Sequence, residues 1–426
     1  MSVENVISPD DMGQFRRLYT VGVPAVVLAF AGVGIWREST APSYSYYRDI
    51  APILNRRCIH CHSGEGLAAR PRLDSCEEVS KVGPKVKYMV QGRMMPPWIA
   101  ENSGICRTWR DASWLTNEEI ATLVHWQEQG MAPGKPAELP PLEGKPPADL
   151  ERVDVTLDTG ADYTPGLGAS AYRCFVVDPE LSRDRGLTGI RVASTDPRMV
   201  AQVTMFALES EAAEVEASRL DRAEPGPGYS CYGSPRVEPA RFVASWTWGA
   251  PALPFPEGTG LRLEGHRKLV IQVHYNVITS GLGAPTRSRV GLRLDDIEQV
   301  RPASFESLAA GDFALTPGKT YVEASGDLTV SRPISVLAVA PQMHTLARTM
   351  QIDHVHAGAR DCAANFDHWN FYSQRLFVYE KPLHLSPGDQ LRITCIYNTE
   401  SVAQPVHRGE SIHDEECKAN LYVVTP

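Results

Sequence analysis

The feature that most constrains this chain is the five-residue motif Cys58-Ile59-His60-Cys61-His62. Two cysteines three positions apart lie on one turn of helix, so both thiols can form thioethers to the two vinyl groups of one haem. The residue after the second cysteine then lies under the iron and can bind it. The motif therefore predicts one covalent haem c, bound through Cys58 and Cys61, with His62 as an axial ligand. His60 is not at the ligand position.

A methionine followed by two prolines offers the second axial ligand. Met95 precedes Pro96 and Pro97, and the fixed backbone of proline stiffens the loop that would carry the sulfur. Methionine ligation raises the reduction potential of a haem, which suits an electron carrier. We predict Met95 as the sixth ligand, with Met94 as the competitor. A further interpretation makes both methionines packing residues.

The motif also allows a zinc site, in which Cys58, Cys61, Cys76 and Cys106 would bind as four thiolates. Under the haem interpretation, Cys76 and Cys106 instead form a disulfide. The chain has nine cysteines, so at least one thiol has no partner within the chain.

An apolar run at 18–36 follows Arg16-Arg17. Its length is near that of a bilayer-spanning helix, and flanking arginines stay in the cytoplasm. We therefore expect residues 1–43 to form a cytoplasmic tail and a single-pass anchor in a bacterial inner membrane, with the bulk of the chain in the periplasm. The alternative is a signal peptide cleaved after Ala29-Phe30-Ala31, which would leave a soluble periplasmic protein.

The rest of the chain changes character along its length. Residues 44–132 are helical in pattern, and Thr116 with Glu119 forms a capping box. Residues 133–150 are a proline-rich linker. Strand-like alternation follows, most clearly at 269–277, with no long helical pattern. We therefore predict a multidomain protein with a small all-α domain, then two all-β antiparallel sandwiches at 151–300 and 301–426.

The segments Tyr46–Leu54, Cys58–His62 and Met95–Trp98 together resemble cytochrome c domains that are fused to other modules in bacterial proteins. Those domains often precede a copper type II, ascorbate-dependent monooxygenase module similar to peptidylglycine α-hydroxylating and dopamine β-monooxygenases. That module consists of two jelly rolls, each holding one copper ion. The resemblance implies a cytochrome c domain at 44–132 and a jelly roll in each of the two sandwich segments.

The second half of the chain carries the segments that resemble this module. Those similar to its two jelly rolls are 244–249, 255–258 and 273–276, then 340–344, 369–374 and 409–417. The resemblance also implies two disulfides, Cys174–Cys231 and Cys395–Cys417, which would leave Cys362 as the odd thiol.

The copper ligands are where the sequence departs from the family. For the first copper, the resemblance implies two adjacent histidines on a strand together with His274. Ala201 and Gln202 stand where that pair belongs. One imidazole does not hold a copper ion that normally has three strong donors.

The second copper position also lacks most of the ligands that the resemblance implies. The resemblance implies a His-x-His pair and a methionine, but the sequence has Gln342, His344 and Glu416 at those positions. Copper(I) prefers imidazole and thioether donors, so we predict that copper is absent. The alternative is a remodelled site in which these three residues bind a harder metal.

Electron transfer through the haem is the function that we expect, with the sandwich module as a docking or structural scaffold. Its partners would be a redox protein or a membrane electron-transfer complex, and no residue is assigned a catalytic role. The net charge of −9 argues against a nucleic-acid partner. Two alternatives are an active copper monooxygenase fed by the haem, and a haem-based peroxidase or redox sensor with an open sixth position. We interpret His354 and His356, on one strand face, as part of a solvated hairpin end.

Overall fold

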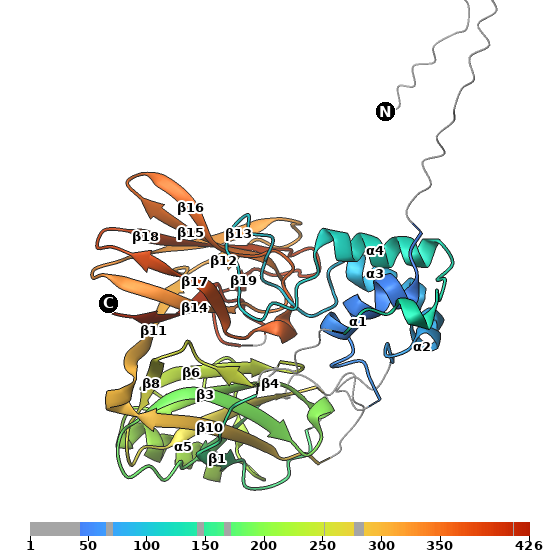
Figure 1. Ribbon diagram of the computed structural model, residues 1–426. Coiled ribbons are helices and arrows are strands. Elements are labelled where there is room, and N and C mark those ends of the chain that lie inside the picture. The colour runs from blue at the N-terminus through green and yellow to red at the C-terminus, as the bar shows by residue number, and fades with distance from the viewer. Residues whose placement is uncertain are drawn as a thin grey trace, which may run out of the picture. The chain divides into compact units, whose positions relative to one another are not determined.

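The computed structural model describes residues 43–64, 71–142, 149–165, 172–250, 252–276, 285–411 and 413–426 (Figure 1). The predicted membrane anchor and residues 143–148 of the proline-rich linker lie outside these residues. Within the described ranges, no helix is long and apolar enough to cross a bilayer.

Helices occupy the segment before the linker. They are η1 (Tyr46–Ile50), α1 (Ala51–Arg57), α2 (Cys76–Lys81), α3 (Gly83–Gln91) and α4 (Asn117–Glu128), and the 3₁₀ turn η2 (Pro136–Glu138) follows in the linker. The predicted capping box starts α4: Thr116 Oγ1 accepts a hydrogen bond from Glu119 N at 3.0 Å, and the Glu119 carboxylate accepts one from Thr116 N at 2.9 Å. The helices bury one apolar cluster, which includes Ile50, Leu54 and Trp126, and Figure 1 shows α3 beside α4.

One part of this segment packs against strands rather than helices. Trp98 and Trp109 are buried in a core formed by strands of the last third of the chain. Trp109 forms a β-bridge with Tyr379, and their rings stack at 4.4 Å. The segment from Trp98 to Trp109 therefore packs in the β core, whereas α4 packs with the other helices.

The disulfides settle the cysteine pairing. Cys106 bonds to Cys362 on β16 (Ala359–Phe366), because the segment around Trp109 runs to that strand. The expected Cys76–Cys106 disulfide is therefore wrong, and Cys362 is not the odd thiol. Cys76 is free, as are Cys58 and Cys61. The pairs Cys174–Cys231 and Cys395–Cys417 are confirmed.

Strands make up most of the remaining structure, which confirms the expected sandwich-like β architecture. The largest sheet has the order β1-β10-β3-β8-β11-β20-β14-β17, with β7 paired to β3. Its strands are β1 (Val155–Asp158), β3 (Arg185–Ser194), β7 (Leu253–Pro254), β8 (Thr259–Leu263), β10 (Ser288–Asp296), β11 (Arg301–Ala309), β14 (Ile334–Gln342), β17 (Phe377–Leu385) and β20 (Lys418–Val424).

Smaller sheets complete the two halves. The five-stranded sheet has the order β5-β2-β9-β4-β6, and the four-stranded sheet has the order β13-β18-β15-β16. Their strands are β2 (Tyr172–Val177), β4 (Val200–Leu208), β5 (Tyr229–Ser230), β6 (Ala240–Thr247) and β9 (Leu269–Tyr275), then β13 (Val322–Thr329), β15 (Ala347–His356), β16 and β18 (Gln390–Tyr397). The remaining elements are a two-stranded sheet and three short 3₁₀ turns. The sheet pairs β12 (Ala314–Leu315) with β19 (Val406–His407), and the turns are η3 (Pro197–Met199), η4 (Ile297–Gln299) and η5 (Phe371–Ser373).

The large sheet runs across the expected boundary at residue 300. β8 and β11 pair in parallel there, with Thr259 opposite Arg301, whereas the other pairs are antiparallel among the described strands. Core residues follow the same continuity, since Leu337 and Tyr422 pack with the apolar side chains of the first half. The two halves therefore share one sheet.

The alternation at 269–277 correctly predicted a strand, and this strand, β9, is buried on both faces. One sequence expectation about the first half, that no long helix follows the linker, was wrong. A helix that was not expected, α5 (Glu211–Ala223), covers the second face, where its Ala217 and Leu220 pack in one cluster with Val270. Its buried face is rich in alanine, and alanine gives a weak hydrophobic signal.

Candidate functional site

The haem motif forms a tight turn directly after α1. His62 N donates a hydrogen bond to Cys58 O at 2.9 Å, and Cys61 N donates to the same oxygen at 3.1 Å. This turn places both thiols and the imidazole on one short piece of backbone. Burial raises the pKa of the Cys58 thiol to about 12, with a smaller contribution from the neighbouring Cys61. Both sulfurs are therefore kept uncharged, as thioether sulfurs also are.

The four-thiolate zinc alternative does not survive in the structure. Cys106 is bonded to Cys362, so that sulfur is unavailable as a ligand. Three thiols remain, at Cys58, Cys61 and Cys76. A structural zinc ion takes four protein ligands, so the set that the sequence offered is incomplete.

His62 is oriented as an iron ligand would be. Its Nδ1 lies 2.9 Å from the carbonyl oxygen of Pro71. A carbonyl only accepts hydrogen bonds, so Nδ1 carries the proton and Nε2 keeps its lone pair. Burial also lowers the pKa of His62, which favours the neutral imidazole. Such an outer hydrogen bond fixes the tautomer of metal-binding histidines, so Cys58, Cys61 and His62 fit a covalent haem.

The two methionines lie in different surroundings. Met95 lines a small cavity with Leu115 and Ile120. Met94 is 38% exposed and lines an open cavity of about 550 Å³, together with residues that include Phe371 and Tyr372. Neither cavity includes His62, so Met95 as the sixth ligand stays a prediction.

The haem turn lies close to the β module at Gly249. A Cβ at Gly249 would lie 3.6 Å from Cys61 Sγ. Gly249 follows β6, and its neighbour Trp248 donates a backbone hydrogen bond to Ala201 O at 2.8 Å. Ala201 is one of the two positions where the first copper would need a histidine. The turn that would carry the haem therefore lies next to the strands of the expected first copper site.

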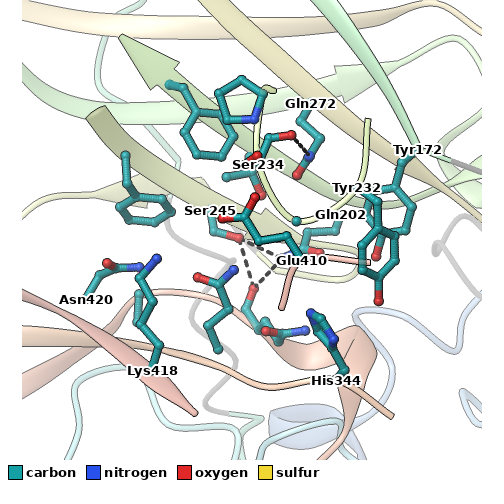
Figure 2. Close-up of a pocket in the computed structure, with 18 of the residues that line it drawn as sticks. Tyr172, Gln202, Tyr232, Ser234, Ser245, Gln272, His344, Glu410, Lys418 and Asn420 are labelled. Carbon is teal, nitrogen blue, oxygen red and sulfur yellow. Dashed lines mark hydrogen bonds between the residues drawn. The ribbon is translucent and has the colours of Figure 1, made fainter. Parts of the chain in front are cut away.

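A polar cavity of about 150 Å³ opens between the five-stranded sheet and strands β14 and β20 (Figure 2). Gln202 Nε2 donates to Ser245 Oγ at 2.9 Å and to Gln374 O at 3.3 Å, and Ser245 Oγ donates to Gln374 O at 3.1 Å. Carboxamides and hydroxyls dominate its wall, from Gln202, Ser245, Gln272, Gln342, Gln374 and Asn420 with Tyr172 and Tyr232.

The expected first copper position lies beside this cavity. Strand pairing places Gln202 opposite His274, which agrees with the alignment inferred from the sequence. The His274 ring is buried and stacks on Tyr172 at 4.1 Å and on Tyr372 at 5.6 Å. Ala201 has no donor atom, and Gln202 offers an amide oxygen, which is a weak copper ligand. Of the three ligands that the family resemblance implies, His274 is therefore the one imidazole present.

The expected second copper position is formed where β14 ends and β20 begins. Gln342, the last residue of β14, is opposite Lys418, the first residue of β20, so His344 and Glu416 each lie two residues beyond the paired strands. His344 Nδ1 donates to Asp414 O at 2.8 Å. Lys418 Nζ lies 3.6 Å from Glu416 Oε1. The residues expected at the site are therefore brought together, with an ammonium group among them.

Two further residues shape this site and were missed in the sequence. The buried Glu415 carboxylate accepts hydrogen bonds from the backbone N–H groups of His344 at 2.9 Å and Leu346 at 2.6 Å, which fixes the loop after β14. Arg375 lines the cavity, and its guanidinium lies 5.0 Å from the ring centre of Trp98. Burial lowers its pKa to about 10. Glu415 lies in the segment 409–417 that resembles the family, but no role was assigned to it, and no sequence motif marks Arg375.

Comparison with known proteins gives a partial match. Residues 316–424 match the model of the copper type II ascorbate-dependent monooxygenase, C-terminal domain. Peptidyl-glycine alpha-amidating monooxygenase A of Xenopus laevis is 25% identical over 207 residues, which are 46% of this chain and 21% of that protein. Dopamine beta-hydroxylase of Canis lupus familiaris is 26% identical over 192 residues, covering 41% and 30%. The rat protein of the same name is 27% identical over 292 residues, covering 64% and 45%. The match therefore spans less than half the length of each of these relatives.

Proposed function

We propose that this chain is a c-type electron-transfer protein in which a cytochrome c domain is joined to a copper-monooxygenase-like module that no longer binds copper at the family's positions. The module then serves as a docking or structural scaffold for the haem domain. The observation that carries this proposal is the ammonium group of Lys418 beside Glu416, at the place where the second copper would lie.

The charge balance of that position supports the loss of copper. Glu416 is 8% exposed in its side chain, and a buried carboxylate is stable when a cation is paired with it. In a metal site the metal ion supplies that charge. Here Lys418 supplies it from the same strand end, so a copper ion would meet a second cation as well as a poor donor set.

The haem part of the proposal rests on local geometry. Cys58 and Cys61 would hold the haem, and His62, held by Pro71 O at 2.9 Å, would bind its iron through Nε2. The haem supplies reversible one-electron chemistry when bound. What the protein adds is the fixed orientation of His62 and the closeness of Cys61 Sγ to Gly249, the glycine that follows β6.

The cellular setting follows from the same proposal. Haem c attachment and three disulfides both suit a compartment outside the cytoplasm. We place the chain in the periplasm, anchored in the inner membrane by residues 1–43, with a redox protein or a membrane electron-transfer complex as its partner.

A second candidate is an active copper monooxygenase that receives electrons from the haem. The match of residues 316–424 to the copper monooxygenase domain favours it. The available metal ligands argue against this second candidate. Each expected copper position has one histidine, His274 or His344, and among the described residues assigned to those positions there is no second imidazole.

The test compares metal content with activity in holoprotein made by cells that attach haem c. We expect one iron and little copper per chain, reversible reduction of the haem by ascorbate, and no oxygen consumption coupled to hydroxylation. A variant with Cys58→Ser and Cys61→Ser controls for the haem, since it keeps the module. Ascorbate-dependent hydroxylation with stoichiometric copper would overturn the proposal in favour of the second candidate.

A further inference from the structure

Two histidines and an aspartate meet where the two central strands of the four-stranded sheet, β15 and β18, have their neighbouring ends. His354 and His356 are two positions apart on β15, so their side chains lie on the same face. Asp389 directly precedes β18, and the pairing of Val355 with Gln390 brings it next to the end of β15. Strand register, and not chain proximity, therefore assembles the three residues.

The donor atoms of these residues converge. His354 Nε2 lies 3.1 Å from Asp389 Oδ2, and His356 Nδ1 contacts Asp389 Oδ1. One donor atom from each of the three residues lies within 4.8 Å of the other two. Two ligands bound to one first-row metal ion at about 2.0–2.1 Å are themselves about 3 Å apart. The spacing of His354 and Asp389 thus matches that of two ligands of a shared ion.

The contact between His354 and Asp389 is poorly aligned for a hydrogen bond. His354 Nε2 is buried and lies 3.1 Å from Asp389 Oδ2, yet it meets no partner in good hydrogen-bond geometry among the described residues. A buried imidazole nitrogen without a well-aligned partner is unfavourable. An ion placed between the nitrogen and the carboxylate would satisfy both groups.

The carboxylate is fixed and has no competing cation beside it. Ser386 N donates to Asp389 Oδ2 at 2.8 Å, which holds the side chain. The two nearby arginines are engaged elsewhere, Arg360 with Asp353 at 3.4 Å and Arg392 with Asp327 at 2.8 Å. In the described part of the chain, the side chains that approach the Asp389 carboxylate are those of the two histidines.

We propose that His354, His356 and Asp389 bind one divalent first-row transition-metal ion. Two neutral imidazoles and one carboxylate are a donor set that such ions favour. Side-chain exposure rises from 5% at Asp389 through 14% at His354 to 65% at His356. The ion therefore enters from the His356 side, where water completes its coordination, and it ties the end of β15 to the turn before β18.

The test uses Zn²⁺ and Co²⁺ with the haem-loaded protein after chelator treatment. We expect one Zn²⁺ per chain by isothermal titration, a rise in the midpoint of thermal unfolding, and a visible ligand-field band with Co²⁺. His356→Ala should weaken the affinity at least tenfold and abolish the band. This variant should fold, because His356 is the most exposed of the three residues.

His368→Ala is the matched control. His368 also pairs with a carboxylate, Asp367, at 2.8 Å, and its side chain is 40% exposed, but it has no second histidine in a convergent group. Its loss should leave the Zn²⁺ affinity unchanged. Equal affinities in the wild-type protein and His356→Ala, or no measurable Zn²⁺ binding, would overturn the proposal and leave a plain His–Asp ion pair. Haem reduction should not change in any of these variants, which separates this test from that of the electron-transfer proposal.

Discussion

Lys418 Nζ lies 3.6 Å from Glu416 Oε1, and the two residues are neighbours on one face of the strand end. Burial raises the pKa of Glu416, and Lys418 opposes that rise. Lys418 lines the cavity together with His344 and Gln342. The lysine therefore favours the ionised form of a buried carboxylate that burial would otherwise drive toward protonation.

Replacing Lys418 with methionine tests that relationship. The variant leaves Glu416 buried without its cation, so the free energy of unfolding at neutral pH should fall by about 1–2 kcal/mol. The folded-state pKa of Glu416 then rises further above its unfolded value. Stability should recover as pH falls toward the unfolded pKa, because the protonated side chain needs no partner. Urea unfolding at several pH values measures this, and Lys418→Arg should behave as the wild-type protein does.

The sixth haem ligand is tested by two single variants. With Met95 on iron, ferric holoprotein should show a weak sulfur-to-iron charge-transfer band in the red, and Met95→Ala should abolish it and lower the reduction potential. Met94→Ala should leave both unchanged, because Met94 faces the open cavity with Phe371. The reverse pattern would make Met94 the ligand. A band unaffected in both variants would exclude methionine ligation.

The disulfide between Cys106 and Cys362 should stabilise the packing of the Trp109 segment on the β core. It joins residues separated by 256 positions, and a disulfide that closes a long loop restricts the unfolded chain most. The double variant Cys106→Ser with Cys362→Ser should lose about 2–5 kcal/mol of unfolding free energy. Chemical denaturation followed by tryptophan fluorescence measures the loss. An unchanged midpoint would show that Trp109 packing alone holds the segment.

The buried His274 predicts a dependence of stability on pH. Desolvation lowers its pKa to about 4, whereas an unfolded histidine has a pKa of about 6.5. Between these values the unfolded chain binds a proton that the folded chain does not, so this group removes stability as pH falls from about 6.5 to 4. His274→Phe keeps a ring between Tyr172 and Tyr372 and cannot titrate. It should therefore be more stable than wild type near pH 5 and change little near pH 8, as thermal unfolding at both values would show.

The sequence was informative wherever local chemistry determines structure. The Cys58–His62 turn and the capping box at Thr116 depend on neighbouring residues, and a β-rich second half follows from short-range alternation. Family resemblance assigned Gln202 and His274 to one site, and the strand pairing brings these two residues opposite each other.

What sequence reasoning missed depends on contacts between distant segments. The Cys106–Cys362 bond arises because Trp98 and Trp109 pack into the β core rather than among the helices. The hydrophobic periodicity of a segment does not reveal which distant core its side chains pack against. Likewise, Asp389 lies 33 positions from His356, and only the pairing of β15 with β18 joins it to the two histidines that had been interpreted as a solvated hairpin end.

The last prediction concerns copper at the two family positions. A mononuclear type II copper needs about three strong donors placed by the fold. The first position offers the stacked ring of His274, and the second offers His344, Gln342 and Glu416 with Lys418 beside them. Copper titration should therefore be carried out in His356→Ala, so that the proposed surface site does not contribute. We expect less than one tightly bound copper per chain and no type II signal with nitrogen hyperfine structure in the electron paramagnetic resonance spectrum. A stoichiometric signal that disappears in His274→Ala or His344→Ala would show that the positions still bind copper, and it would promote the monooxygenase over the electron-transfer scaffold.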